Sequence, residues 1–343
     1  MNSNEAENNK KNGGQPDGYQ DILVGYPSGK HNRKILEDSF SFARILGARV
    51  TIAFVTDPFP DQLAFTGPSG VDPWVVKVIE QEKEQLIKEF REGLMEFEEK
   101  TGISPTVLTP EGSPAEVLEN LSQDYDITVI GSGREKETPL RRLGSVARNV
   151  VRFAQSPVLV VREWPGEKNL GDVKRILVPV DGSEVSGFAV AHASHIAQRT
   201  GATITLLHVW DRKDEKVIQR LHTDIVRARE VKDILGQKLL DRSEKSLAAG
   251  QQAERQIMEG DPAEIISGLS GSYDLVVMGT WGRTGLKKFL LGGVAESVAN
   301  HAHCAVLLIR GLSNESPSSA TETADHQDRA RSFPSTRPVP ELQ

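Results

Sequence analysis

The sequence has little of what several classes of protein require. Cys304 is the only cysteine among 343 residues, so no disulfide can form within the chain, and this favours a reducing cytoplasm. No apolar run is long enough to cross a bilayer, and residues 1–18 carry no secretory-signal pattern. The formal net charge of −7 argues against partners such as nucleic acid or an anionic membrane. We therefore expect a soluble, cytoplasmic protein.

Two nucleotide-binding signatures are also missing. The chain has no G-x-x-x-x-G-K-[ST] sequence, which excludes a P-loop, and no G-x-G-x-x-G follows its first apolar run, which excludes the dinucleotide-binding fingerprint. What remains is the composition of a globular protein, with 38% hydrophobic and 26% charged residues. The chain is long enough for two domains with cores of their own.

The chain contains an internal duplication. Residues 111–162 align without a gap on residues 259–310, with 20 identities in 52 positions. The stretch EGSPAEVLENLSQDYDITVIG at the start of the first segment lies on EGDPAEIISGLSGSYDLVVMG at the start of the second. Earlier segments match more weakly. We infer two copies of one unit, called here the first repeat (19–162) and the second repeat (173–311).

Each repeat alternates short β-branched runs with helical stretches, which predicts parallel strands covered by helices on both faces. The predicted strands are 21–26, 49–55, 104–109, 126–131 and 157–162 in the first repeat, and 174–180, 203–209, 254–259, 274–279 and 305–310 in the second. The expected fold class is α/β: two tandem doubly wound domains, each with a five-stranded parallel sheet in the order 3-2-1-4-5.

Local signals predict where some helices begin and end. Gly201 and Gly250 are expected at helix C-termini, and Asp261 followed by Pro262 at a helix start. Ser183 is expected to cap the helix that follows the first strand of the second repeat.

Composition also predicts how the domains are connected. We expect a polar linker at 163–172 and disordered tails at 1–18 and 312–343, which are rich in Ser, Pro, Asn and charge. The last apolar runs, 156–162 and 304–310, would each leave an uncovered sheet edge. We therefore expect the two repeats to pair with each other through these last strands, and the sequence leaves a homodimer open.

The most informative loop is GTWGRTGLKKFLLGG, residues 279–293, which follows a predicted strand and leads into a predicted helix. In open parallel sheets, ligands bind beyond the carboxyl ends of the strands, where the strand order reverses. That point lies between the first and fourth strands of the second repeat, which end at Asp181 and Gly279. The pattern therefore places an acidic residue opposite a glycine-rich loop.

This loop has the features of an anion site. Gly279 and Gly282 allow the backbone to approach a ligand closely. Gly292 and Gly293 open a helix, whose N–H groups favour negative charge. Arg283 and two lysines add positive charge. The features favour a nucleotide with its phosphates over the glycines, and a merely flexible loop is the alternative interpretation.

At these residues the sequence resembles the universal stress protein family. Nucleotide-binding members of that family carry G-x-x-G, nine residues and then G-[ST], and Gly279, Gly282 and Gly292 match this frame. Further similar stretches are ILVPVDGSEVS (176–186), LLHVW (206–210), GDPAEII (260–266) and HAHCAVLLIR (301–310). The resemblance covers both repeats. It implies a stress-response or signalling module that binds ATP, with or without Mg²⁺.

The resemblance also implies which residues bind the nucleotide. Asp181 and the backbone at Val209 would hold the adenine, and the glycines with the start of the last helix would hold the ribose and phosphates. The full expected set is Pro179, Asp181, Val209, Gly279, Gly282, Arg283, Gly292, Gly293 and Val294. No catalytic residue and no metal ligand is expected.

Departures from the family pattern bear on function. Gly293 stands where the pattern has Ser or Thr, so we expect ATP binding in the second repeat to be weakened but not abolished. In the first repeat, Pro27 takes the place of Asp181, and Arg134 replaces the second glycine. We therefore expect the first repeat to be mainly structural, with a degenerate nucleotide site.

Two other functions stay open. A nucleotide-free interaction scaffold is favoured by the departures at Gly293 and Pro27. A slow nucleotide hydrolase is compatible with the fold class, although Asp181 is the only evident general base and Walker-type magnesium ligands are missing.

Two histidine patterns invite a metal or site interpretation. HAHC at 301–304 is better explained as a helix-to-strand junction, with Cys304 a packed core thiol. His192 and His195 are interpreted as part of a half-exposed helical face.

Overall fold

The computed structural model describes residues 18–26, 33–56, 73–132, 143–162, 169–211, 225–281 and 291–311. The predictions for the two tails, for most of the linker, and for Gly282, Arg283, Pro27 and Arg134 fall outside these residues. Among the helices of the described part, none is both long and apolar enough to span a membrane.

The elements of the first repeat alternate strand and helix along the chain. They are β1 (Asp21–Tyr26), α2 (Arg33–Leu46), β2 (Arg49–Phe54), α3 (Pro73–Thr101), β3 (Thr106–Leu108), α4 (Pro114–Ser122), β4 (Ile127–Gly131), α5 (Ser145–Phe153) and β5 (Val158–Val161). The short 3₁₀ helix η1 (Leu170–Asp172) leads into the second repeat.

The second repeat follows the same plan. Its elements are β6 (Arg175–Pro179), α6 (Glu184–Thr200), β7 (Thr203–Trp210), α8 (Ile225–Glu244), β8 (Ala253–Glu259), α9 (Pro262–Leu269), the 3₁₀ helix η2 (Ser270–Ser272), β9 (Leu275–Gly279), α10 (Gly293–His301) and β10 (Ala305–Ile309).

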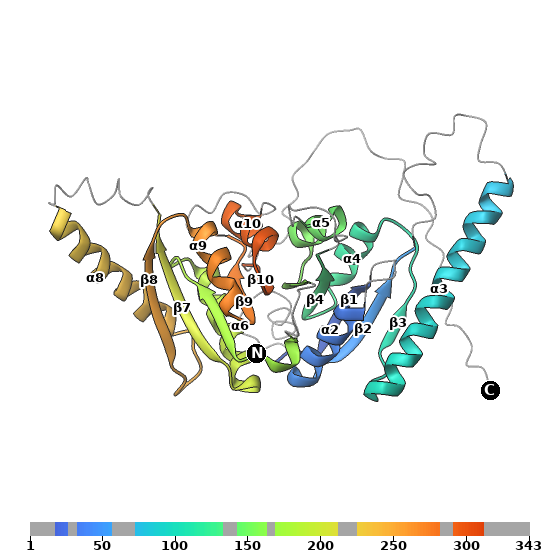
Figure 1. Ribbon diagram of the computed structural model, residues 1–343, viewed down its shortest axis with the longest axis horizontal. Helices are drawn as coiled ribbons and strands as arrows, with labels where there is room; N and C mark the ends of the chain where they lie inside the picture. The colour runs from blue at the N-terminus through green and yellow to red at the C-terminus, as the bar shows by residue number, and fades with distance from the viewer. Residues whose placement is uncertain are drawn as a thin grey trace, which may run out of the picture. The chain divides into compact units, whose positions relative to one another are not determined.

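The described strands form one sheet in the order β3-β2-β1-β4-β5-β10-β9-β6-β7-β8 (Figure 1). Within each repeat the pairs are parallel and the order is 3-2-1-4-5, so the predicted fold class is confirmed. The last strands of the repeats, β5 and β10, pair antiparallel, with Val160 opposite Val306. Each apolar edge is therefore covered by the other.

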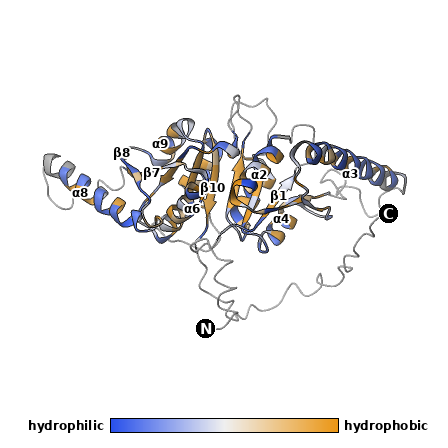
Figure 2. Cartoon of the chain, turned by 90° about the horizontal axis from the view of Figure 1, so that it is seen from below, coloured by the Kyte–Doolittle hydropathy of each residue, from blue (hydrophilic) through white to orange (hydrophobic). Residues whose placement is uncertain are grey.

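Helices cover the sheet on both faces, and each face has its own core. One apolar cluster joins buried residues of α2, α3, α6 and α8 to the sheet, and the other joins those of α4, α5, α9 and α10. The colouring of Figure 2 shows hydrophobic residues along the central strands, and residues of these strands belong to both clusters. This double burial is the reason central strands such as β9 and β10 are continuous apolar runs rather than alternating ones.

Capping residues set the ends of several helices. The Ser183 side chain accepts from Ser186 N at the start of α6, and Asp261 accepts from two N–H groups at the start of α9. Gly201 ends α6 in the left-handed conformation, with φ of +73°. These three predictions are confirmed. The prediction for Gly250 is wrong, because α8 ends at Glu244 and Gly250 lies in the turn before β8.

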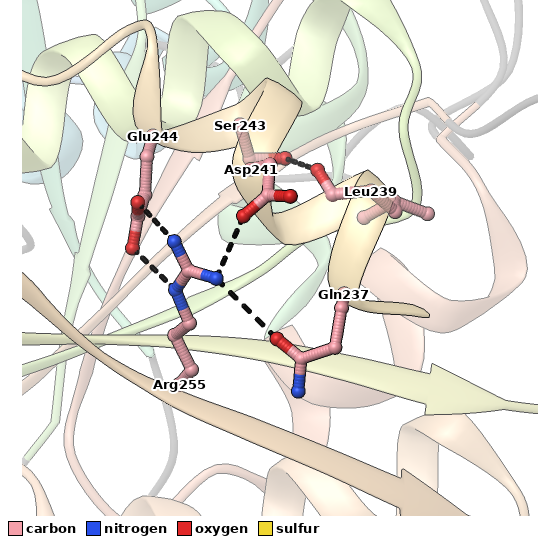
Figure 3. A network of polar contacts seen from close by, with 6 residues as sticks. All are labelled: Gln237, Leu239, Asp241, Ser243, Glu244 and Arg255. Atoms are coloured by element: carbon pink, nitrogen blue, oxygen red, sulfur yellow. Dashed lines mark hydrogen bonds and ion pairs between the residues drawn. The ribbon is translucent and has the colours of Figure 1, made fainter. Parts of the chain in front are cut away.

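An ion-pair network ties α8 to the edge strand β8 (Figure 3). The Arg255 guanidinium of β8 donates to both carboxylate oxygens of Glu244, and its Nη1 lies 2.7 Å from Asp241 Oδ1. These bonds raise the pKa of Arg255. Because the bond to Glu244 is bidentate, it fixes the helix on the strand more firmly than a single surface ion pair would.

Two arginines, the buried Arg162 and the half-buried Arg310, join the repeats reciprocally. Arg162, directly after β5, donates to Ala299 O of α10. Arg310, directly after β10, donates to Val151 O of α5 at 2.9 Å, and burial lowers the pKa of its side chain to about 10. In the alignment of the repeats, Arg162 matches Arg310 and Val151 matches Ala299. Each arginine therefore binds carbonyls near the C-terminus of the other repeat's last helix, where no intrahelical donor is available and the helix dipole is negative.

A second contact between the repeats corrects the interpretation of His192. Its Nδ1 lies 2.5 Å from the Oη atom of Tyr19, and only 3% of the residue is exposed. His192 is therefore buried rather than half-exposed, because the segment before β1 covers it. The half-buried His195 makes an edge contact with the same tyrosine, and burial lowers the pKa of its imidazole.

Candidate functional site

The carboxyl end of β6 carries the acidic residue of the predicted site. Asp181 lies two residues beyond Pro179, is half-buried, and is held by its own loop. Its Oδ1 accepts from Ser183 N at 3.0 Å and from Ser183 Oγ at 2.6 Å. Gly182 between them has a φ of +81°, a conformation that glycine adopts without strain. The carboxylate is thus oriented before any ligand arrives.

The carboxyl end of β7 places the backbone of Val209 on the side of β6. Leu207 O accepts from Val180 N on that side, whereas Trp210 O accepts from Gly260 N on the side of β8. Since neighbouring residues of a strand alternate in direction, Val209 shares the direction of Leu207. The paired register of β6 and β7 ends with Pro179 opposite Leu207, so Val209 lies beyond it.

The carboxyl end of β9 is joined directly to the start of α10. Thr280 O accepts from Gly292 N at 2.8 Å, which fixes the helix start on the end of the strand. Gly292 is the N-cap residue and makes no side-chain cap. The first intrahelical bond found there runs from Glu296 N to Gly292 O. The N–H groups of the first turn, from Gly293 on, therefore have no acceptor within the helix.

The three described glycines of the motif have different surroundings. A Cβ at Gly279 would lie 2.8 Å from Val185 Cγ1, and one at Gly292 would lie 2.9 Å from Thr280 O. Both glycines are therefore required by the packing of the protein itself. A Cβ at Gly293 would meet no atom of the described residues within 4 Å outside its own helix and chain neighbours. With respect to the described part of the chain, position 293 is open.

The sheet order brings these ends together. β6 lies between β9 and β7, so the reversal of strand order falls between β6 and β9, as expected for a ligand crevice. Of the nine predicted site residues, seven are described, at the ends of three adjacent strands or at the start of α10: Pro179, Asp181, Val209, Gly279, Gly292, Gly293 and Val294. Gly282 and Arg283 lie outside the described residues.

The chain matches the universal stress protein family over residues 18–162 and 172–310. It belongs to that family. A universal stress protein of Methanocaldococcus jannaschii is 35% identical over 140 residues, which cover 40% of this chain and 82% of that protein. One of Mycobacterium tuberculosis is 29% identical over 199 residues, covering 58% of this chain and 66% of that protein.

Solved structures agree with the assignment of the fold. A universal stress protein from Archaeoglobus fulgidus has a TM-score of 0.59 at 20% identity, and the match covers 84% of this chain and 98% of that one. A functionally unknown protein from Pseudomonas aeruginosa has a TM-score of 0.55 at 17% identity, covering 85% of this chain and 93% of that one. At these identities the likeness shows the fold alone.

In this universal stress protein the corresponding strand ends of the first repeat are packed differently. Gly25 corresponds to Pro179, and a Cβ there would lie 2.7 Å from Leu118 Cδ1. The next residue, Tyr26, contacts the rings of Phe54 and Phe90 at centroid distances of 6.2 and 5.0 Å. The end of β1 is therefore occupied by packing side chains of its own repeat.

The two histidines of HAHC (301–304) each lie within hydrogen-bond distance of a nearby backbone carbonyl. His301 Nδ1 lies 2.8 Å from Ser297 O, and His303 Nδ1 lies 3.1 Å from Ser267 O. Cys304 is buried in the core, as predicted. In the described part of the chain, no group of three or more His, Cys, Asp or Glu side chains is placed to hold a metal ion.

Sequence reasoning missed the side chains that join the repeats near this site. They are Arg162 and Arg310, described above, and the contacts of Arg152 and Asn300 across the repeats. An arginine directly follows the last strand of each repeat, at matching positions of the alignment. This match was a visible signal for Arg162 and Arg310.

Proposed function

We propose that this universal stress protein is a stress-response or signalling module of the cytoplasm whose second repeat binds an adenine nucleotide, with ATP as the expected ligand. The observation that carries the proposal is the arrangement at the strand-order reversal. There a pre-oriented carboxylate, Asp181, and the start of α10 at Gly292 lie at the ends of adjacent strands. Nucleotides are suited to such a crevice because they present a polar base and anionic phosphates.

Each part of the nucleotide has a candidate partner. As the family resemblance implies, Asp181 and the backbone of Val209 would hold the adenine, and Val209 lies beyond the residues of β7 that pair with β6. The N–H groups of Gly293 and Val294 would bind the phosphates. Outside its own helix, no described residue lies within 4 Å of a Cβ at position 293, so the helix start fits an anion without displacing any described side chain. The family pattern adds Gly282, and Arg283 would add positive charge in the same loop.

A bound Mg²⁺ would take most of its ligands from the phosphates and from water. This follows from its preference for oxygen ligands and retained water, and from the lack of a carboxylate cluster in the described residues. We propose slow hydrolysis at most. Turnover faster than about one per second, the low end of typical enzymes, would contradict this part of the proposal.

The proposal is tested by identifying and then removing the ligand. Mass spectrometry of small molecules released by denaturing the purified protein is expected to find an adenine nucleotide, or else added ATP is expected to raise the melting temperature. Gly282→Arg gives the second repeat the residue that the first repeat carries at Arg134, and it should abolish both effects. The matched control, Arg134→Gly, should leave them unchanged. Full binding by Gly282→Arg would refute the site.

A nucleotide-free scaffold is the second candidate. A specific observation favours it: Gly279 and Gly292 are both explained by packing against Val185 and Thr280, without any ligand. An empty purified protein, together with no change in melting temperature at millimolar ATP or ADP, would support the scaffold instead.

We also propose that the two repeats stay paired in solution through β5 and β10. The reciprocal arginine contacts support this, because each guanidinium donates to a backbone carbonyl of the other repeat. Light scattering then distinguishes a single chain from a homodimer, which would use another surface because β5 and β10 pair with each other. Two separate unfolding transitions would argue against the pairing.

A further inference from the structure

A charged pair between the repeats lies beside the proposed phosphate site. Arg152 of α5 belongs to the first repeat, and its Nη2 lies 2.9 Å from Oε1 of Glu296 in α10. Glu296 is the acidic residue in the first turn of the helix whose N–H groups would bind the phosphates. Both side chains are about one-third exposed, at 38% and 31%, so water screens the pair only in part.

The position of Glu296 has opposite effects on the empty and the occupied site. A carboxylate in the first turn stabilises a helix start, but it repels an anion bound there. Glu296 and an anion bound at the start of α10 would be separated by about one helical turn, ~5 Å along the helix axis. This distance is shorter than the Debye length of about 8 Å at physiological salt. An unpaired Glu296 would therefore weaken phosphate binding, and a cation at its side would offset the repulsion.

The corresponding positions of the two repeats are used differently. In the alignment, Arg152 matches Asn300, and Arg148 matches Glu296. Asn300 Oδ1 accepts from Leu143 N at 2.8 Å, and Arg148 Nη2 donates to Leu143 O at 3.2 Å. These two residues thus hold the chain just before α5. The pair of Arg152 and Glu296 instead balances charge at the start of α10.

We infer that the first repeat tunes the phosphate affinity of the second through Arg152, a positioning residue that neutralises and holds Glu296. The inference rests on the proposed nucleotide site. It gives the first repeat a role in ligand binding although its own site is degenerate. The effect depends on ligand charge, so it should increase from adenosine through AMP and ADP to ATP.

Calorimetric titrations of the full chain with these four ligands test the inference. For Arg152→Gln we expect ATP to bind roughly three- to tenfold more weakly, with adenosine changed less than about twofold. Arg152→Lys should keep most of the ATP affinity. Adding Glu296→Gln to Arg152→Gln should restore ATP binding to within about twofold of the wild type, because the repelling charge is gone. Raising the salt concentration should shrink the difference between Arg152→Gln and the wild type.

Arg148→Gln is the matched control. It removes the same charge from the same helix without touching Glu296, so ATP affinity should stay within about twofold of the wild type. An equal loss in Arg148→Gln would show a general charge effect and overturn the inference. An equal loss for adenosine and ATP in Arg152→Gln would show mere structural support, and it would overturn the inference as well. Absence of ATP binding by the wild type would refute the proposed function, and the inference with it.

Discussion

Restoring the missing hydroxyl at position 293 should strengthen nucleotide binding. Gly293 stands where nucleotide-binding universal stress proteins carry Ser or Thr, and it is the first residue of α10. A Cβ there would meet none of the described residues within 4 Å outside α10 and its chain neighbours, and the residue is exposed. Gly293→Ser therefore adds a donor for phosphate without strain.

The size of the gain follows from two opposing contributions. A hydrogen bond to a charged group contributes about 1.5–3 kcal/mol, and ordering the serine side chain costs about 0.5–1 kcal/mol. The net gain is about 1–2 kcal/mol, which corresponds to a roughly 5- to 30-fold lower Kd for ATP. Adenosine should gain little, since it has no phosphate.

Calorimetric titration with ATP and adenosine measures this directly, and two variants serve as controls. Gly293→Ala adds the Cβ and its effect on the helix without the hydroxyl, so it should leave the Kd for ATP within about twofold of the wild type. Ser145→Gly removes the matching hydroxyl from the first repeat and should have no effect. An unchanged Kd in Gly293→Ser, or an equal gain in Gly293→Ala, would refute the reasoning.

Three further predictions concern stability. Gly279→Ala should lower the free energy of unfolding by about 1–3 kcal/mol, because its Cβ would lie 2.8 Å from Val185 Cγ1; an unchanged urea midpoint would contradict this. Burial lowers the pKa of His195 below its usual 6.5, so the unfolded state binds more protons just below that pH, and stability should fall as the pH is lowered through this window. His195→Gln should flatten the dependence, and an identical slope would count against the assignment. Tyr19→Phe should cost about 1–2 kcal/mol by removing the bond to His192, and a melting curve that matches the wild type would argue against that bond in solution.

The strands and their order could be predicted because their signals are local. Each central strand is a short apolar run buried on both faces, whereas the edge strands β3 and β8 are partly exposed. The duplication doubles every signal. The strand predicted at 174–180 is found at Arg175–Pro179, and helix starts with their own capping side chain, such as Asp261, were equally visible. The prediction of a helix C-terminus at Gly250 was wrong because glycine adopts the left-handed conformation readily in any turn, not only after a helix.

The positions of the candidate site residues could also be predicted, but not what surrounds them. Strand ends in a doubly wound sheet identify Asp181 and Gly279 as neighbours of the point where the strand order reverses. The reason for Gly279 lies in Val185, whose approach depends on how α6 packs on the sheet. His192 was misinterpreted for a related cause: the tyrosine that covers it is 173 residues away in sequence. Contacts of this kind leave no periodic pattern.

The number of nucleotides bound per chain tests the central claim most directly. A calorimetric titration of the full chain with ATP should give one site per chain, since only the second repeat keeps the acidic residue and the second glycine of the motif. The same titration of Gly282→Arg should give none. Two sites per chain, no site in the wild type, or one site that survives Gly282→Arg would contradict the account.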